Sequence, residues 1–241
     1  MLFDSPNTLA AGGNTGLTAA EKLTIVANRY NMPGLLQMQP SEQNIYDSID
    51  ISTFSIAGST TVSFFSSVNS KAFPLTNLQQ NQLKAGNVIV VMYVQFAVMT
   101  FAVDANNNPT ALLDCRTLEE CINSTTPAAA TNLKPILGSQ MTLVIGSSEV
   151  FKDLPIINSY AGFNPDARFG AKTASPATGN AIVQYGSSNM NLASEPVILP
   201  QLEFKLNLQI PRLSAVPAAG TQWLRATLGG FGTIPAMKSP M

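Results

Sequence analysis

The chain has 241 residues, of which 45% are hydrophobic and only 11% are charged, and its formal net charge is −1. An ordinary soluble domain has about 25% charged residues, so this surface is poorly protected against self-association. We interpret it as a surface to be buried against copies of the same chain; the alternative is an ordinary neutral domain. The absence of histidine excludes a Ser-His-Asp triad, a Cys-His pair and a histidine zinc site.

The two cysteines, Cys115 and Cys121, are too few for a disulfide framework. We expect two buried thiols rather than a local bridge. Residues 1–6 include Asp4 and lack the basic and apolar segments of a signal peptide. We therefore expect the product to stay in the reducing cytoplasm where it is made.

Residues 1–16 are rich in Gly, Asn and Thr without periodicity, which predicts a loose arm. Residues 17–30 predict the one clear helix, because Thr18 and Glu21 have the spacing of a capping box and Asn31 and Pro33 follow as stop signals. The helix is either an ordinary packing helix or a docking element for a neighbouring subunit or an internal layer. Residues 36–46 then predict a polar Gln/Pro connector.

The most apolar stretch is residues 88–103, VIVVMYVQFAVMTFAV, which carries no charge. Its length allows a membrane-spanning or buried helix, but its β-branched and aromatic content favours a strand. Both alternating faces are apolar, so we expect the strand to be buried on both faces. The second face could be covered by the N-terminal helix, by a long loop or by an adjacent subunit.

The rest of the chain predicts strands joined by long loops. A hairpin is expected from residues 48–56 and 60–68, and a short helix capped by Asp114 from residues 112–123. Residues 202–210 alternate most regularly, with Leu202 and Phe204 facing in and Glu203 facing out. Glycine-rich residues 229–232 predict a turn. Further strands are expected at residues 141–151, 155–160, 181–185 and 223–231, and loops at residues 69–86 and 164–180. Strands do not alternate with helices, so the fold class is all-β: a sandwich, jelly roll or barrel.

No group of residues predicts a catalytic, cofactor-binding or metal site. Residues 12–16 are glycine-rich and precede the helix, but they lack the lysine of a phosphate-binding loop. Glu119 and Glu120 stand near the cysteines, yet fit a solvated helix face better than a metal site. The lysines and arginines are scattered, which disfavours strong nucleic-acid binding.

Two carboxylate pairs could serve a glycosidase, Glu149 with Asp153 and Glu195 with Glu203. Glu203 is expected to face outward, and the chain has a single Trp, Trp223, for stacking on sugars. We therefore expect no enzyme.

The order of an arm, a short amphipathic helix, a Gln/Pro-rich connector and a series of strands resembles the coat proteins of tailless icosahedral bacteriophages, lipid-containing ones included. Residues 17–30, 37–46, 48–68 and 87–103 carry this architectural resemblance. It implies a jelly-roll shell domain whose arm and helix lie on the inner side, toward a membrane or a neighbouring subunit. About eight strands favour a single roll over a compact double roll, which would need about sixteen.

We therefore expect an N-terminal arm, helix and connector at 1–47, a jelly-roll β domain at 48–235 and a C-terminal tail at 236–241. The expected function is that of a major capsid protein that self-assembles into an icosahedral shell. Expected partners are copies of itself, other capsid proteins and, through the arm, an internal membrane or the genome, with no small-molecule substrate and no cofactor. Its expected place is the virion, after synthesis in the host cytoplasm.

The alternative is a carbohydrate-binding jelly-roll module or a spike domain. Exposed aromatic pairs in the loops would favour that alternative, and the loop of residues 69–86 offers only Phe73. A catalytic domain is a third possibility, which the missing histidine disfavours.

Overall fold

The computed structural model of the chain describes residues 18–37, 39–118, 133–156, 189–192 and 195–234. The elements in chain order are α1 (Ala19–Arg29), η1 (Pro33–Gln37), β1 (Gln39–Asp50), η2 (Ile51–Thr53), β2 (Thr60–Phe64), η3 (Val68–Ser70), β3 (Ile89–Val103), β4 (Pro109–Thr117), η4 (Lys134–Gly138), β5 (Gln140–Ile145), β6 (Ser148–Pro155), β7 (Asn189–Asn191), β8 (Val197–Ile198), β9 (Phe204–Ile210) and β10 (Gln222–Ile234).

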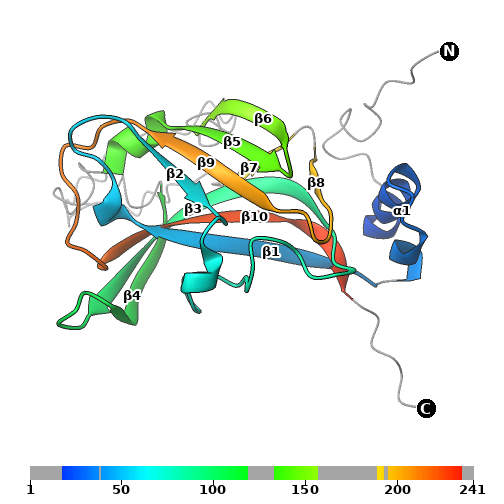
Figure 1. The fold of residues 1–241 in the computed structure, drawn as a ribbon, viewed down its shortest axis with the longest axis horizontal. Helices are drawn as coiled ribbons and strands as arrows, with labels where there is room; N and C mark the ends of the chain where they lie inside the picture. The colour runs from blue at the N-terminus through cyan, green and yellow to red at the C-terminus, as the bar shows by residue number, and fades with distance from the viewer. Residues whose placement is uncertain (1–17, 38, 119–132, 157–188, 193–194, 235–241) are drawn as a thin grey trace, which may run out of the picture.

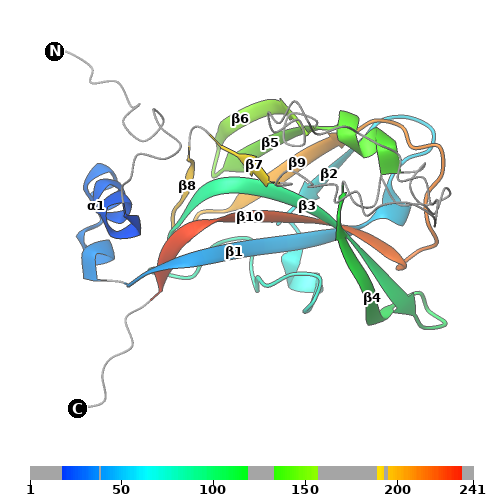
Figure 2. The ribbon, with the colours of Figure 1, turned by 180° about the vertical axis from the view of Figure 1, so that it is seen from behind.

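The strands form two antiparallel sheets that lie face to face, so the all-β sandwich is confirmed (Figures 1 and 2). One sheet has the order β1-β10-β3-β4, and β7 and β8 also pair with β3. The other has the order β2-β9-β5-β6. The main hydrophobic core lies between the sheets, and α1 lies at one end of the sandwich (Figure 1).

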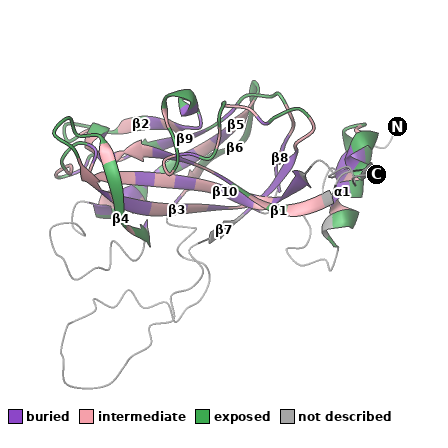
Figure 3. Ribbon diagram, turned by 90° about the horizontal axis from the view of Figure 1, so that it is seen from below, coloured by how far each residue is buried: buried purple, intermediate pink, exposed green. Residues whose placement is uncertain are grey.

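Strand β3 confirms the prediction of a long buried strand, and its ladder with β10 explains the two apolar faces. Tyr93 pairs with Gly229 and Val91 with Gly230, so Met92 is an extra residue, a β-bulge. Before the bulge the odd positions contribute to the core between the sheets, and after it the even positions do. The inward-facing residues are Ile89, Val91, Val94, Phe96 and Val98. Both alternating sets are therefore apolar because each faces the core over part of the strand; Figure 3 shows the resulting burial along β3.

Helix α1 covers the second face of β3 at its N-terminal end. Val88 and Val90 belong to a separate cluster with Leu23, Val26 and Leu35. The expectation of burial on both faces is thus met at this end. After the bulge the outer face carries half-buried side chains at Tyr93, Gln95 and Ala97, whereas Met99 is fully buried.

The predicted capping box of α1 is also confirmed. The Thr18 N–H donates to Glu21 Oε2 at 2.7 Å, and the Glu21 N–H donates to Thr18 Oγ1 at 3.3 Å. Two hydrogen bonds to the exposed Glu21 carboxylate lower its pKa: above all the one from the Thr18 N–H, and then one from the Thr18 hydroxyl at 2.9 Å. The carboxylate also complements the positive end of the helix dipole.

The predicted connector at residues 36–46 is wrong, because β1 begins at Gln39 and pairs with β10 along its whole length. The boundary drawn between residues 47 and 48 therefore falls inside a strand. The hairpin of residues 48–56 and 60–68 is wrong as well, since β2 pairs with β9. Both errors concern non-local pairing: a polar edge strand is stabilised by a partner about 180 residues away in sequence, which local patterning does not reveal.

Three further predictions are corrected. Residues 109–117 form β4 and not the start of a helix, because β3 provides a pairing edge for them. The strand expected at residues 141–151 is the hairpin of β5 and β6, turned at Gly146 with φ of 59°. Residues 229–232 lie inside β10, where glycine permits close contact with Tyr93 and with the β3 backbone.

The alternation of β9 and the strand at β10 are confirmed, but Leu202 precedes β9 and is 40% exposed. The strand predicted at residues 181–185 and the loop at residues 164–180 lie outside the described residues. So do residues 1–17 and the tail at 236–241.

Candidate functional site

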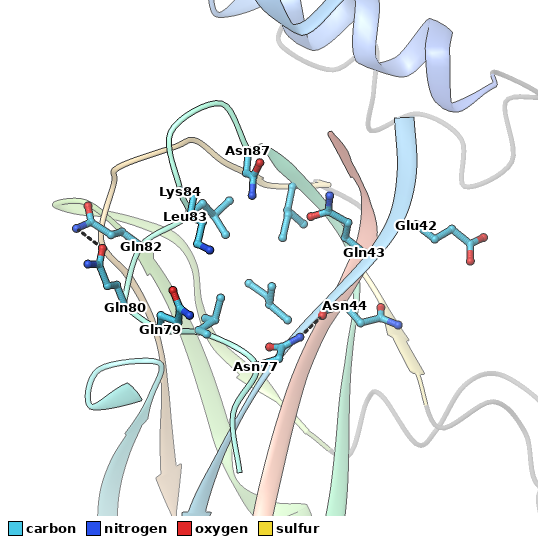
Figure 4. Close-up of a pocket in the computed structure, with 13 residues that line it drawn as sticks. Glu42, Gln43, Asn44, Asn77, Gln79, Gln80, Gln82, Leu83, Lys84 and Asn87 are labelled. Atoms are coloured by element: carbon cyan, nitrogen blue, oxygen red, sulfur yellow. Dashed lines mark hydrogen bonds between the residues drawn. The ribbon is translucent and has the colours of Figure 1, made fainter. Parts of the chain in front are cut away.

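A pocket of about 590 Å³ opens between β1 and the loop of residues 77–87, and we call it the β1 pocket (Figure 4). Its wall carries amide side chains on both sides, and apolar residues lie among them. The lining residues are Glu42, Gln43, Asn44, Ile45, Asn77, Leu78, Gln79, Gln80, Gln82, Leu83, Lys84, Asn87 and Ile89.

The loop binds the outer edge of β1 over a short length only. The Tyr46 N–H donates to Asn77 Oδ1 at 2.9 Å, and the Tyr46 carbonyl accepts from Thr76 Oγ1 at 2.9 Å. The Asn77 amide also donates to the Asn44 carbonyl at 2.7 Å. Asn77 thus acts as a substitute for a neighbouring strand at residues 44–46.

Beyond Asn44 the same edge is open. Backbone groups alternate in direction along an antiparallel strand, so Glu42 and Pro40 point to the same side as Tyr46. Proline has no N–H, and no described strand pairs with β1 on this side. Among the described residues the Glu42 N–H therefore has no acceptor and is a free donor at the mouth of the β1 pocket, and the Glu42 carbonyl accepts only from the Ser41 hydroxyl at 3.2 Å.

The charges around the β1 pocket are unequal. The Glu42 side chain points away from the pocket, across β1 (Figure 4). Lys84 is exposed and is not in an ion pair within the described residues. The pocket therefore presents neutral amides and one cation to its surroundings.

An ion pair links α1 to the sandwich at the same end of the molecule. The Lys22 ammonium lies 3.2 Å from Glu195 Oε1, with side-chain exposures of 13% and 8%. The ammonium also lies 5.7 Å from the centroid of the Phe231 ring. The helix therefore packs on its own chain, as the packing interpretation expected.

Strand β4 projects from the opposite end of the sandwich (Figures 1 and 2). It exposes Leu112 and Leu113, at 46% and 66%. Cys115 on this strand is exposed, so the expectation of a buried thiol is wrong for it. The reason is that both faces of a projecting edge strand meet solvent; Cys121 lies outside the described residues.

The candidate carboxylates do not form a common site. Glu149 and Asp153 are both exposed on β6, where Glu149 pairs with Lys152 at 3.3 Å. Glu195 is buried against Lys22, whereas Glu203 is exposed.

In the described part of the chain, no group of three or more His, Cys, Asp or Glu side chains is placed to hold a metal ion. The glycine-rich residues 12–16 and the acidic pair at 119–120 lie outside it. No described helix has both the length and the apolar character needed to cross a membrane.

Sequence reasoning missed the β1 pocket. The amide-rich run at residues 77–82, NLQQNQ, was a usable signal, but it was interpreted only as part of a loop. The facing residues of β1 were assigned to a connector, so nothing brought the two amide-rich segments together.

Compared in turn with protein-family models, curated proteins and solved structures, the chain gives no match.

Proposed function

We propose that the chain is a major capsid protein, a structural protein whose sandwich is a single jelly roll and which assembles into an icosahedral shell. In this proposal it is not an enzyme and needs no cofactor. Its partners are copies of itself and other capsid proteins, and its arm reaches an internal membrane or the genome. It is made in the host cytoplasm and ends in the virion.

The observation that carries the proposal is the nested order of strand pairing. The first strand pairs with the last, β1 with β10, and the second pairs with the last but one, β2 with β9. Inside these pairs, β3 pairs with β7 and β8, and β5 pairs with β6. If β7 and β8 count as one interrupted strand, the nested strands number eight: β1, β2, β3, β5, β6, β7 with β8, β9 and β10. Together they form a long hairpin rolled into two sheets.

A rolled hairpin of this kind is the jelly-roll plan, which viral coat domains share with lectins and cupins. Strand β4 stands outside the nesting and extends the free end of β3. The described residues contain one such nesting, which supports a single roll over a compact double roll.

Surface character supports self-association. The chain has few charges for its size. Large apolar side chains are also exposed at several separate places, among them Phe73 at 83%, Leu113 at 66% and Ile56 at 52%. Burial of such side chains at contacts between subunits would stabilise an assembly.

The test is the assembly state of the purified chain. Size-exclusion chromatography with light scattering, followed by negative-stain electron microscopy, should detect capsomers or shells. A monodisperse monomer at high concentration and over a range of salt concentrations would contradict the proposal.

The β1 pocket gives the alternative, a carbohydrate-binding module or spike domain, one observation in its favour. Amide side chains both donate and accept hydrogen bonds and suit sugar hydroxyls. The pocket lining includes no aromatic ring on which a sugar could stack. Titration with neutral oligosaccharides, followed by calorimetry, distinguishes this candidate from the first.

A further inference from the structure

We propose that the β1 pocket binds an extended segment of polypeptide, the N-terminal arm (residues 1–16) of a second copy of this chain, which pairs with the free edge of β1. The inference rests on the proposed function, because self-assembly brings the second copy. It adds a binding site and an occupant to that function, and it assigns the arm to a neighbouring subunit in place of a membrane or the genome.

The free edge of β1 provides the main-chain partners. The Glu42 N–H and carbonyl point to the pocket side, and the loop closes the edge only at residues 44–46. An unpaired edge is a template for another extended strand, and added strands are held by main-chain hydrogen bonds. An extended peptide can therefore pair with β1 on the N-terminal side of residue 44, where the hydrogen bonds from Asn77 end.

The chemistry of the pocket wall suits peptide groups. A side-chain amide has one hydrogen-bond acceptor and two donors. It can therefore pair with both the carbonyl groups and the N–H groups of a peptide backbone. The only hydrogen bond between the loop amides runs from Gln82 Nε2 to Gln80 Oε1 at 3.5 Å, at the limit of such a bond. Most of the hydrogen-bonding capacity of Gln79, Gln82 and Asn87 is therefore not used by other described residues. Apolar residues of the lining, such as Leu78 and Leu83, can receive alternate side chains of an extended strand.

The composition of the arm selects it over the C-terminal tail. Residues 1–16 contain one charged side chain, Asp4, and one proline. The opposite charge of Asp4 complements the unpaired Lys84 at the pocket. Residues 235–241 contain Lys238, which would be repelled, and two prolines, which remove main-chain donors.

The arm is also long enough for the task. An extended chain spans at most about 3.3–3.6 Å per residue, so 16 residues reach roughly 50 Å. The arm joins the chain at Thr18, the N-cap of α1, which lies at the same end of the molecule as the pocket (Figure 4). A subunit contact at this end would place the arm of one copy within reach of the β1 pocket of the next.

The experiment is a titration of the full-length chain, kept at a concentration at which it is unassembled so that neighbouring arms do not fill the β1 pocket, with a fluorescent peptide of residues 1–16, followed by fluorescence anisotropy. Saturable binding is expected. Glu42→Pro should weaken it at least tenfold, because proline removes the N–H that points away from β10 and leaves the β1–β10 ladder intact. The matched control, Glu42→Ala, keeps the N–H and removes a side chain that points away from the pocket, so it should bind as the unchanged chain does.

A second probe covers the case in which Glu42→Pro does not fold. The same peptide, N-methylated at alternate residues, cannot donate to a strand edge and should bind the unchanged chain at least tenfold more weakly. Equal binding of the methylated peptide, equal binding by Glu42→Pro, or no binding at all would overturn the inference. Displacement of the peptide by a neutral oligosaccharide would overturn it in favour of a sugar site.

The outcome is separable from that of the capsid proposal. A chain that forms shells but, before assembly, does not bind the peptide would leave the capsid function standing and remove this inference. A chain that binds the peptide but stays monomeric would do the reverse, showing a peptide site without a shell.

Discussion

The buried ion pair between Asp47 and Lys71 allows a quantitative prediction. Asp47 lies on β1 with its side chain fully buried, and the Lys71 ammonium lies 2.9 Å from each of its carboxylate oxygens. The Phe65 N–H also donates to this carboxylate, at 2.7 Å. The pair thus connects β1 of one sheet to the chain that leaves β2 of the other.

We predict that Lys71→Met destabilises the fold by about 3–5 kcal/mol, the usual cost when one member of a buried pair is removed. Coulomb attraction at 2.9 Å is about 6 kcal/mol for an effective dielectric constant of 20. Desolvation of both charges offsets much of this attraction in the intact chain. In the variant the carboxylate keeps its desolvation cost and only the Phe65 hydrogen bond.

Lys152→Met is the matched control. Its partner Glu149 lies 3.3 Å away, but the side chains are 64% and 51% exposed, so the loss should be at most about 0.5 kcal/mol. Urea unfolding followed by circular dichroism measures both variants. The melting temperature should fall by roughly 10 °C for Lys71→Met.

A double variant tests the cause. Asp47→Asn combined with Lys71→Met removes both charges, so it should be more stable than the sum of the two single losses implies. The reasoning is refuted if Lys71→Met lies within about 1 kcal/mol of Lys152→Met, or if the two losses simply add.

Three further predictions concern the bulge, the β3–β4 turn and the helix. Gly230→Ala should cost about 2–3 kcal/mol in urea unfolding, because its methyl group would overlap the backbone of β3, whereas Gly58→Ala has no atom within 4 Å and should be neutral or slightly stabilising. Hydrogen bonds, first from the Asn108 side chain, lower the pKa of Asp104. The Asp104 carboxylate therefore stabilises the fold above its unfolded pKa of about 3.9, and this stabilisation is lost as the pH falls through the lower pKa of the folded chain. Melting curves against pH should show Asp104→Asn less stable than the unchanged chain at neutral pH and equal to it in strong acid. In the unassembled chain, deletion of residues 1–16 should leave the melting temperature nearly unchanged, whereas deletion of residues 1–30 should lower it because α1 covers Val88 and Val90. Equal melting temperatures would show that the helix is dispensable to the sandwich.

Local features of the chain could be predicted from sequence. The Thr18 and Glu21 capping box, the strand at residues 89–103 and the alternation of β9 depend on residues that are close together in the chain. Their preferences act within a few residues, so patterning reveals them. The all-β class followed from the same evidence.

Features that depend on partners far away in sequence could not be predicted. Strand β1 is polar because it lies at a sheet edge, and its pairing with β10 joins residues such as Tyr46 and Thr227. Residues 112–117 were taken for the start of a helix because Asp114 suits a helix N-cap, and the pairing of β4 with β3 is not visible in the local pattern. The β1 pocket was missed for the same reason, since its two walls come from a supposed connector and a supposed loop.

The stretch at residues 88–103 illustrates the division. The sequence by itself determined that this segment is a strand, uncharged and apolar on both alternating faces, because β-branched and aromatic side chains set that preference locally. Only the tertiary structure decided why both faces are apolar. The bulge at Met92 exchanges the inward-facing positions, and α1 covers Val88 and Val90 on the other side. Ladder register and helix docking are set by surfaces that meet only in the folded chain, so no local pattern encodes them.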